Sequence, residues 1–293
     1  MMQDAYSLIT PAADDDKFIP LIFDSPHSSR VCPPDMQTTA PEAALMSGWD
    51  AYVDELWSGA TQFGASLLAA RVHRSYIDFN RARSDIDPEL LEQPWPEVIQ
   101  VSEKSQAGMG LIRRYALPGV PMYERKLSIA EVLQRIDRYY DPYHAQLQQL
   151  ISAAHARCGQ VWHIDCHSMK SVGNAMNIDN GARRPDFVLG DRNGSAADPA
   201  FTLWVAQQLQ AQGYLVKIND PYRGAELVRA YSDPQHGRNS IQIEINRALY
   251  MDEQSLQRSA GFVTLQNNLT LLVESMSRYI VGKLVGKFVD KPD

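Results

Sequence analysis

The sequence predicts an α/β protein built on a single mixed, largely parallel sheet with helices on both faces. Short apolar runs bounded by turn residues alternate with amphipathic segments, and neither a repeat nor a low-complexity segment interrupts them. The 293 residues, 44% of them hydrophobic, could form one large α/β domain or two small ones. One domain is the simpler prediction.

The first part of the chain predicts a strand, a helix and two further strands. Residues 19–25, IPLIFDS, form an apolar run that ends at the turn sequence PHSS, as in a short buried strand. Strands at 66–72 and 75–79 are expected to cover the apolar stripe of the intervening helix. That stripe has near-helical spacing and consists of Leu45, Trp49, Val53, Leu56 and Trp57.

The second half alternates more regularly. Ser128 and Glu131 form a capping-box sequence, which predicts a helix that leads into a strand at 161–169. The inner face of this helix carries Leu133, Ile136, Tyr140, Tyr143, Leu147 and Leu150. Asp198 and Pro199 begin another helix. Strands are predicted at 213–218 and 240–246, and a final amphipathic helix from about 254 to 282.

Residues 84–127 are poorly patterned. They hold many of the prolines and the glycines of AGMGLIRR, so we interpret them as loops near a site, and as a candidate lid, instead of a linker. One catalytic domain is therefore predicted over residues 18–285. An N-terminal extension, 1–17, and a C-terminal tail, 286–293, flank it.

The charge and the termini limit the partners that we expect. The formal net charge is -7, and the basic residues are too dispersed to form a stripe for nucleic acid or a polybasic helix for membranes. The N-terminus lacks the features of a signal peptide, and no segment is long and apolar enough to span a bilayer. The three cysteines form no CxxC pair. We expect a cytoplasmic protein that binds neither nucleic acid nor membranes.

The segment VWHIDCHSM, residues 161–169, ends a core strand with polar residues. Side chains alternate across a strand, so His163, Asp165 and His167 share one face. Such a line could hold a metal at the carboxyl end of the strand. Ordinary strand-end hydrogen bonds explain this segment alone equally well.

Polar residues also follow three other apolar runs. They are His27 in SPHSS, Asp78, Asn80 and Arg81 in YIDFNRAR, and Glu244, Asn246 and Arg247 in QIEINRA. Ligands bind at the carboxyl ends of strands in open α/β sheets, so these residues are expected to line one cleft. Two histidines and a carboxylate suffice for a catalytic zinc, and another carboxylate can act as general base. Separate caps and hydrogen bonds are the alternative interpretation.

Seven motifs stand in a characteristic order: SPHSS, WDAYVDELW, RSYIDFNRAR, HIDCHSM, RPDFVLGDRNG, GAELVRAYSDP and SIQIEINRALYM. Together they resemble the N-formylglutamate amidohydrolase, or N-formylglutamate deformylase, family over about residues 18 to 282. The resemblance implies the fold of the zinc carboxypeptidases and aspartoacylases, which is phosphorylase/hydrolase-like, with zinc at the strand ends. It also implies hydrolysis of N-formyl-L-glutamate to formate and L-glutamate in bacterial histidine degradation.

The resemblance implies a site for Zn²⁺. The PH pair after the first strand makes His27 one ligand, and the HS pair after the central strand makes His167 another. The carboxypeptidases place a carboxylate three residues after their first histidine, where this chain has an arginine. Asp50, which opens the DxxV pattern, is the preferred third ligand, with Asp54 and Glu55 as alternatives. Such a site also binds Mn, Fe or Co.

The same resemblance implies catalytic roles. Glu244 in IEIN corresponds to the general base in the FEL motif of the carboxypeptidases, which takes a proton from water and delivers it to the leaving nitrogen. Arg74 is expected to support the oxyanion. Asp165 is expected to orient a ligand histidine, and His163 is interpreted as structural.

The implied substrate has two carboxylates. DFNR is similar to the DLNR of the aspartoacylases, so Asn80 and Arg81 are expected to bind one of them. Arg229 in ELVRAY is the first candidate for the second carboxylate, and Arg247 is the next. A surface salt bridge is an equally good interpretation of Arg74 and Arg247.

Two alternative functions remain open at this stage. The chain could be a related metal-dependent amidase or carboxypeptidase-like hydrolase that acts on another N-acyl amino acid. It could also be a binding protein of the same fold, although the presence of Glu244 argues against this. In each case the partner is a small molecule, and the sequence does not determine the oligomeric state.

Overall fold

A seven-stranded sheet organises the computed structural model, which describes residues 4–11, 18–173 and 179–289. The order of the strands in space is β1-β3-β2-β6-β9-β7-β8. β2, β3, β6 and β9 are parallel, whereas β1 and β7 run antiparallel to β3 and β9. The strands are β1 Tyr6–Ile9, β2 Leu21–Ser25, β3 Ser66–Ala70, β6 Val161–Met169, β7 Phe187–Gly190, β8 Val216–Ile218 and β9 Arg238–Asn246. The predicted mixed, largely parallel sheet is confirmed.

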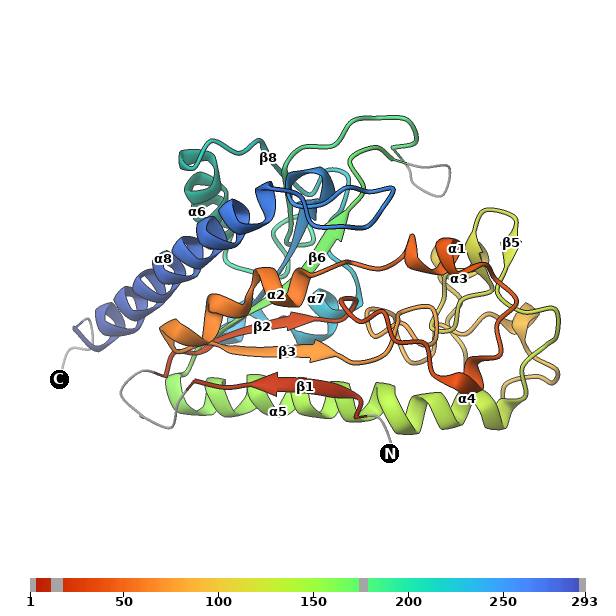
Figure 1. Cartoon of the computed structure of the whole chain (residues 1–293). Helices are drawn as coiled ribbons and strands as arrows, with labels where there is room; N and C mark the ends of the chain where they lie inside the picture. Colours follow the sequence, from red (N-terminus) through yellow and green to blue (C-terminus); the bar gives the residue numbers. More distant parts are fainter. Residues whose placement is uncertain (1–3, 12–17, 174–178, 290–293) are drawn as a thin grey trace.

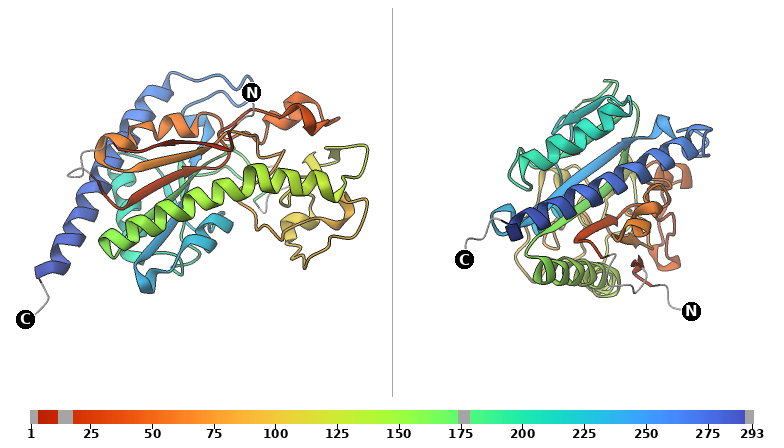
Figure 2. Two further views of the ribbon diagram at one scale, coloured as in Figure 1. Left: turned by 90° about the horizontal axis from the view of Figure 1, so that it is seen from below. Right: turned by 90° about the vertical axis from the view of Figure 1, so that its left-hand side faces the viewer.

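Helices cover both faces of this sheet. α5 (Asp141–Cys158) and α7 (Glu226–Tyr231) pack on one face, and α2 (Val53–Leu56), α6 (Pro199–Ala211) and α8 (Gly261–Val289) lie on the other. The right-hand view of Figure 2 shows α5 end-on below the sheet and α6 and α8 above it. Alternation along β2 explains the two layers, because Phe23 contacts Trp57 whereas Asp24 accepts a hydrogen bond from Tyr143.

The long helical segment before β6 begins as predicted. Ser128 and Glu131 form a capping box at the start of α4 (Ile129–Arg135). One π-helical turn, Ile136–Tyr140, joins α4 to α5, and α5 ends at Gly159 in the left-handed conformation (φ 67°). This helix therefore returns the chain to the amino end of β6.

The carboxyl ends of the parallel strands meet the loops of residues 84–127. In Figure 1 the arrows of β2 and β3 point towards these loops. The loops contain the short α3 (Glu103–Gln106) and the hairpin of β4 (Tyr115–Leu117) and β5 (Val120–Pro121). Residues 84–127 are mostly irregular, in agreement with the sequence prediction, and they form a wall beside the strand ends.

The helix predicted from Leu45 to Trp57 is interrupted. The structure has α1 (Glu42–Met46) and α2, separated by a segment in which Tyr52 adopts a left-handed φ of 61°. The backbone N–H of Asp50 donates to the carbonyl of His27 at 3.1 Å. This contact with a distant loop replaces helical hydrogen bonds and brings Asp50 beside His27.

Other helices and strands begin or end at residues that differ from the predicted ones, because contacts between distant residues override the local sequence pattern. Residues 75–79, predicted as a strand, form turns, and the backbone N–H of Asp78 bonds to Leu111. The final helix starts at Gly261 and reaches Val289, not 254 to 282, and β8 is shorter than predicted. β1, within the predicted N-terminal extension, and β7 were not predicted because each has four residues. Residues 1–3, 12–17 and 290–293 of the predicted extension and tail lie outside the described residues.

Candidate active site

Three buried side chains converge at the carboxyl ends of β2 and β6. They are His27, just after β2, Asp50, between α1 and α2, and His167 on β6, and one ligand atom of each lies within 4.8 Å of the others. The Nδ1 atoms of His27 and His167 are 3.1 Å apart. Asp50 Oδ2 lies 3.0 Å from Nδ1 of His167 and 3.6 Å from Nδ1 of His27. Three potential ligand atoms therefore face one point.

A carboxylate lies close to the outer ring nitrogen of each histidine. His27 Nε2 lies 2.8 Å from Asp78 Oδ1, and His167 Nε2 lies 2.7 Å from Asp165 Oδ1. Metal-bound histidines commonly donate their other ring N–H to a carboxylate, which fixes the tautomer and the ring orientation. Two such imidazoles and the Asp50 carboxylate are a donor set that suits zinc and several other divalent ions.

The electrostatics of this cluster favour positive charge at its centre. Burial alone would raise the pKa of Asp50, but hydrogen bonds with His167 and His27 hold it well below its usual value. Burial alone would likewise lower the pKa of His167, but the neighbouring Asp165 and Asp50 carboxylates raise it well above its usual value. The carboxylates thus attract a cation or a proton to the point between the histidines.

The alternative ligands lie elsewhere. Within the described residues, the single histidine, cysteine and carboxylate cluster suited to a metal contains Asp50 and neither Asp54 nor Glu55. Glu55 pairs with Arg258. His163 bonds to Ser240 and Asp24, each at 2.8 Å, so both of its ring nitrogens have partners.

Glu244 stands beside the cluster on β9. It is the register partner of His167 on β6, and Gln242 Nε2 donates a hydrogen bond of 2.9 Å to its Oε1. Burial raises the pKa of Glu244 to about 7, an effect that nearby His167 opposes and the Asp50 carboxylate reinforces. A carboxyl group with this pKa exchanges protons readily near neutral pH.

A cleft of about 630 Å³ opens at these strand ends. Its lining combines the three potential ligands and Glu244 with several basic residues. It includes the predicted Arg74, Asn80, Arg81 and Arg247, as well as Lys104, Arg113 and Arg184 from segments for which the sequence predicted no site residue.

Contacts distinguish the predicted substrate residues. Arg81 donates to the carbonyls of Met109 and Asn80 at 3.0 Å, which aligns its guanidinium along the cleft wall. The Asn80 amide is already engaged, since its Nδ2 donates to Asp165 and its Oδ1 accepts from the backbone N–H of Leu227. Asn80 therefore braces Asp165 behind His167.

Two predicted arginines line the cleft and pair with buried carboxylates of the site. Arg74 donates to Asp78 from Nε and Nη2, at 3.2 and 2.9 Å. Arg247 donates to Asp50 at 2.9 Å and to Ser168 at 3.0 Å. Both are interior ion pairs, so the alternative of a surface salt bridge is wrong for each.

Arg229 is not brought to the cleft. Its side chain is 56% exposed and pairs with Glu226 three residues earlier on α7, at 2.6 Å. It is absent from the lining of the cleft. On a short surface helix, pairing with the local carboxylate directs the guanidinium to solvent, which the motif ELVRAY did not reveal.

Sequence reasoning missed two kinds of residue. Asp78 was noted at a strand end but was not assigned to His27, although it lies in the same DFNR motif as Asn80 and Arg81. Arg113 and Lys104 belong to the unpatterned 84–127 segment, where no periodicity indicates which side chains turn inward.

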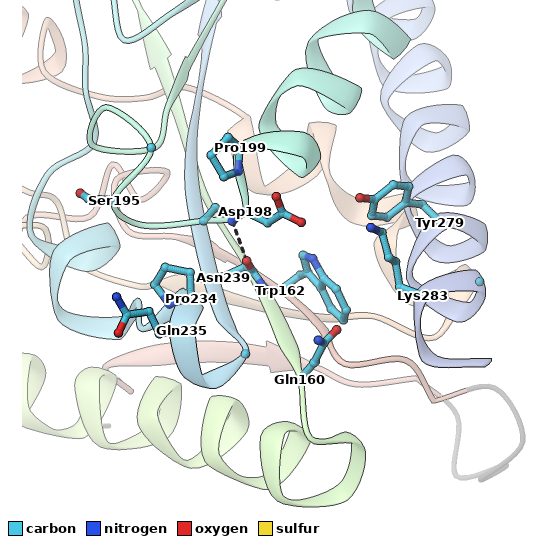
Figure 3. A pocket seen from close by; sticks show the side chains of 14 residues that line it. Gln160, Trp162, Ser195, Asp198, Pro199, Pro234, Gln235, Asn239, Tyr279 and Lys283 are labelled. Carbon is cyan, nitrogen blue, oxygen red and sulfur yellow. Dashed lines mark hydrogen bonds between the residues drawn. The ribbon is translucent and has the colours of Figure 1, made fainter. Parts of the chain in front are cut away.

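A larger hollow, of about 880 Å³, lies at the opposite, amino ends of β6 and β9. Figure 3 shows Trp162 and Asn239 at its base, the start of α6 at one side, and Tyr279 and Lys283 of α8 at another. The backbone N–H of Asp198 donates to Asn239 Oδ1 at 2.8 Å. None of the residues that line it belongs to the cluster suited to a metal.

The cluster and Glu244 lie within a region of the sequence that matches a known protein family. The sequence profile described as N-formylglutamate amidohydrolase matches residues 19–251. The chain belongs to the N-formylglutamate amidohydrolase family. The resemblance noted in the sequence is thereby confirmed.

Members of the N-formylglutamate amidohydrolase family match over most of the chain. The crystal structure of N-formylglutamate amidohydrolase from Ralstonia eutropha JMP134 has a TM-score of 0.90 and 42% identity, and the match covers 95% of this chain and 99% of that one. The N-formylglutamate deformylase of Pseudomonas aeruginosa is 29% identical over 241 residues, 81% of this chain and 84% of that protein. A gene product of Agrobacterium tumefaciens, Atu2144, shares the fold at 17% identity and a TM-score of 0.63.

Across the described residues, each helix is too short or too polar to cross a bilayer.

Proposed function

We propose that the chain hydrolyses the formyl amide of N-formyl-L-glutamate to formate and L-glutamate, as a step of histidine degradation. The observation that carries the proposal is the convergence of His27, Asp50 and His167 beside Glu244 in a cleft with basic walls. Family membership and the names of the relatives agree with this reaction.

His27, Asp50 and His167 would hold one divalent metal, with Zn²⁺ as the first candidate and Mn, Fe or Co as alternatives. The fit rests on the donor set and on Asp78 and Asp165, which orient the two imidazoles. A divalent ion there supplies Lewis-acid chemistry that polarises a carbonyl group and acidifies water.

Glu244 carries the protons in this proposal. Hydrolysis adds a water oxygen to the formyl carbon, breaks the carbon–nitrogen bond and transfers a proton to the leaving nitrogen. As a carboxylate, Glu244 takes the proton from the attacking water, and as a carboxylic acid it returns a proton to the amine. Its pKa of about 7, raised by burial, suits it to both steps near neutral pH.

The arginines of the cleft bind and orient the acidic substrate. Arg81 is aligned by two backbone carbonyls and has the forked geometry that suits a carboxylate. Arg74 lies between Asp78 and Asp50, 3.9 Å from the latter, where it supports negative charge that develops on the formyl oxygen. Arg247 holds Asp50 in position.

The test is an assay for released formate. The purified protein is depleted of metal and then supplied separately with Zn²⁺, Mn²⁺, Fe²⁺ or Co²⁺. A panel of N-formyl, N-acetyl and N-formimidoyl amino acids provides the substrates. We expect the highest kcat/KM for N-formyl-L-glutamate and little activity without metal. Preference for another N-acyl amino acid would assign the chain to the related amidases, and inactivity on the whole panel would refute the proposal.

A further inference from the structure

Arg113 is a buried cation in the cleft wall with no carboxylate of its own. Its side chain is 8% exposed, and its Nε lacks a hydrogen-bond partner among the described residues. The one carboxylate within ion-pair distance in the described part of the chain is Asp78, 3.8 Å from Nη2. Asp78 already bonds to His27 and Arg74 at 2.8 and 2.9 Å. The carboxylate nearest to Arg113 is therefore already bonded to two other side chains.

The surroundings of Arg113 increase this excess of positive charge. Lys104, Arg81 and Arg74 line the same cleft. Burial, and after it the charge of nearby Arg74, lowers the pKa of Arg113 to about 9. The pKa of Lys104 is also lowered, first by burial and then by the three arginines.

A buried cation without a partner destabilises a protein, because it loses hydration without gaining an ion pair. We expect the guanidinium of a structural arginine to donate hydrogen bonds to a carboxylate. Arg184 does so, because its Nε and Nη2 donate to the two carboxylate oxygens of Asp179. The cations gathered in the cleft, and the lack of a carboxylate bonded closely to Arg113, instead suit an anion that enters the cleft from solution.

We propose that Arg113, with Lys104 beside it, binds the side-chain carboxylate of the substrate, while Arg81 binds the α-carboxylate. This inference rests on the proposed function and identifies the residue that makes the cleft select N-acyl dicarboxylic amino acids. It replaces Arg229, which the structure places at the surface. Arg81 Nε donates to the carbonyl of Met109, and Met109 forms a backbone bridge with Arg113, so the two arginines are neighbours in the cleft and can bind the two carboxylates of one substrate.

The thermal stability of an Arg113 variant distinguishes a role in binding an anion from a role in holding the fold together. If Arg113 awaits an anion, Arg113→Met removes an uncompensated buried charge, and the thermal midpoint of the full chain stays level or rises. If Arg113 holds the fold together, the midpoint falls. Arg113→Lys keeps the charge without the fork and provides a second variant if the methionine variant is poorly folded.

Binding tests the inference without catalysis. Glutarate and butyrate, which differ by one carboxylate, are titrated calorimetrically into the full chain without added metal. The wild-type protein should prefer glutarate, and Arg113→Met should weaken glutarate binding about 10- to 100-fold and abolish the preference. Arg83→Met is the matched control, because Arg83 pairs with Glu97 and Asp141 outside the cleft. An unchanged preference in Arg113→Met would overturn the inference.

Kinetics then assign the carboxylates. N-formylnorvaline lacks the side-chain carboxylate, and 4-formamidobutanoate lacks the α-carboxylate. Arg113→Met should lower kcat/KM for N-formylglutamate and 4-formamidobutanoate but not for N-formylnorvaline. Arg81→Met should lower kcat/KM for N-formylglutamate and N-formylnorvaline but not for 4-formamidobutanoate. Losses on the same analogue would contradict the assignment. If the wild-type protein hydrolyses N-formylglutamate and Arg113→Met hydrolyses it equally well, this inference is wrong and the proposed function stands. If glutarate binding depends on Arg113 but the wild-type protein does not hydrolyse N-formylglutamate, the proposed function is wrong and this inference stands.

Discussion

The two ends of β6 and β9 differ in how they hold polar groups. At the amino end, the hollow of about 880 Å³ is lined by exposed Asp198 and Lys283 over a base of Trp162 and Asn239. At the carboxyl end, the smaller cleft contains His167, Glu244 and other buried charges held by short hydrogen bonds.

The larger of the two spaces is not the one that holds the candidate site. Exposed polar groups are satisfied by water and need no particular geometry. Buried charges are costly, so they persist where a network orients them, and such networks coincide with shifted pKa values at functional sites. Here the carboxyl end has the buried network, and the amino end has the larger space.

The strongest test of the comparison removes a proposed ligand at the carboxyl end. His167→Ala should abolish stoichiometric metal binding, measured by elemental analysis, and lower kcat/KM for N-formylglutamate by at least about three orders of magnitude. The reason is the loss of one of three converging donors. Full metal content in a folded His167→Ala protein would show that the ligand set is wrong.

The next largest effect is expected at Glu244. Glu244→Gln keeps the shape of the side chain and its position beside His167, but it cannot exchange protons. Metal content and KM should stay nearly constant, while kcat falls about a hundredfold or more. Glu89→Gln, the same substitution at an exposed residue outside the cleft, is the matched control. Near-normal turnover in Glu244→Gln would make Asp165 the next candidate.

A third test compares two histidines of α5 that lie towards the two ends of the sheet. His144 is half-buried beside Tyr231, and burial lowers its pKa from 6.5 to about 4. The unfolded chain therefore binds more protons between these pH values. The stabilisation from neutral His144 is complete above about pH 6.5 and is lost as the pH falls towards 4, by at most about 3 kcal/mol.

Urea unfolding as a function of pH measures this effect. His144→Gln should flatten the decline in the free energy of unfolding between pH 6.5 and 4. His155 of the same helix, which bonds to the carbonyl of His236 near the amino end, provides the control variant His155→Gln. Equal slopes in wild type and His144→Gln would contradict the prediction.

The smallest effect is expected in the amino-end hollow. Lys283→Ala and Gln235→Ala change exposed residues that line it (Figure 3). Formate release should change less than about twofold, because surface substitutions away from a network alter stability by about 0.5 kcal/mol or less. A large loss of kcat/KM in either variant would show that the amino-end hollow also contributes to activity, which would contradict the prediction.

Much of the fold follows from local patterns in the sequence. The alternation of apolar runs with amphipathic segments predicted the mixed sheet and its two helical layers, and Ser128 and Glu131 predicted the start of α4. β1 and β7 were beyond such reasoning, since four residues are too few for a reliable period and their pairing involves distant strands.

For the candidate site, the sequence by itself determined which residue types follow the parallel strands. His27, His167 and Glu244 were named from their place after apolar runs, because the carboxyl ends of parallel strands meet at one edge of a sheet. Tertiary structure alone decided how irregular segments reach that edge. It broke a predicted helix to bring Asp50 to His27, and it turned Arg113 inward while Arg229 faces solvent. The physical reason is that loop positions depend on contacts between residues far apart in the chain, which leave no periodic trace in the sequence.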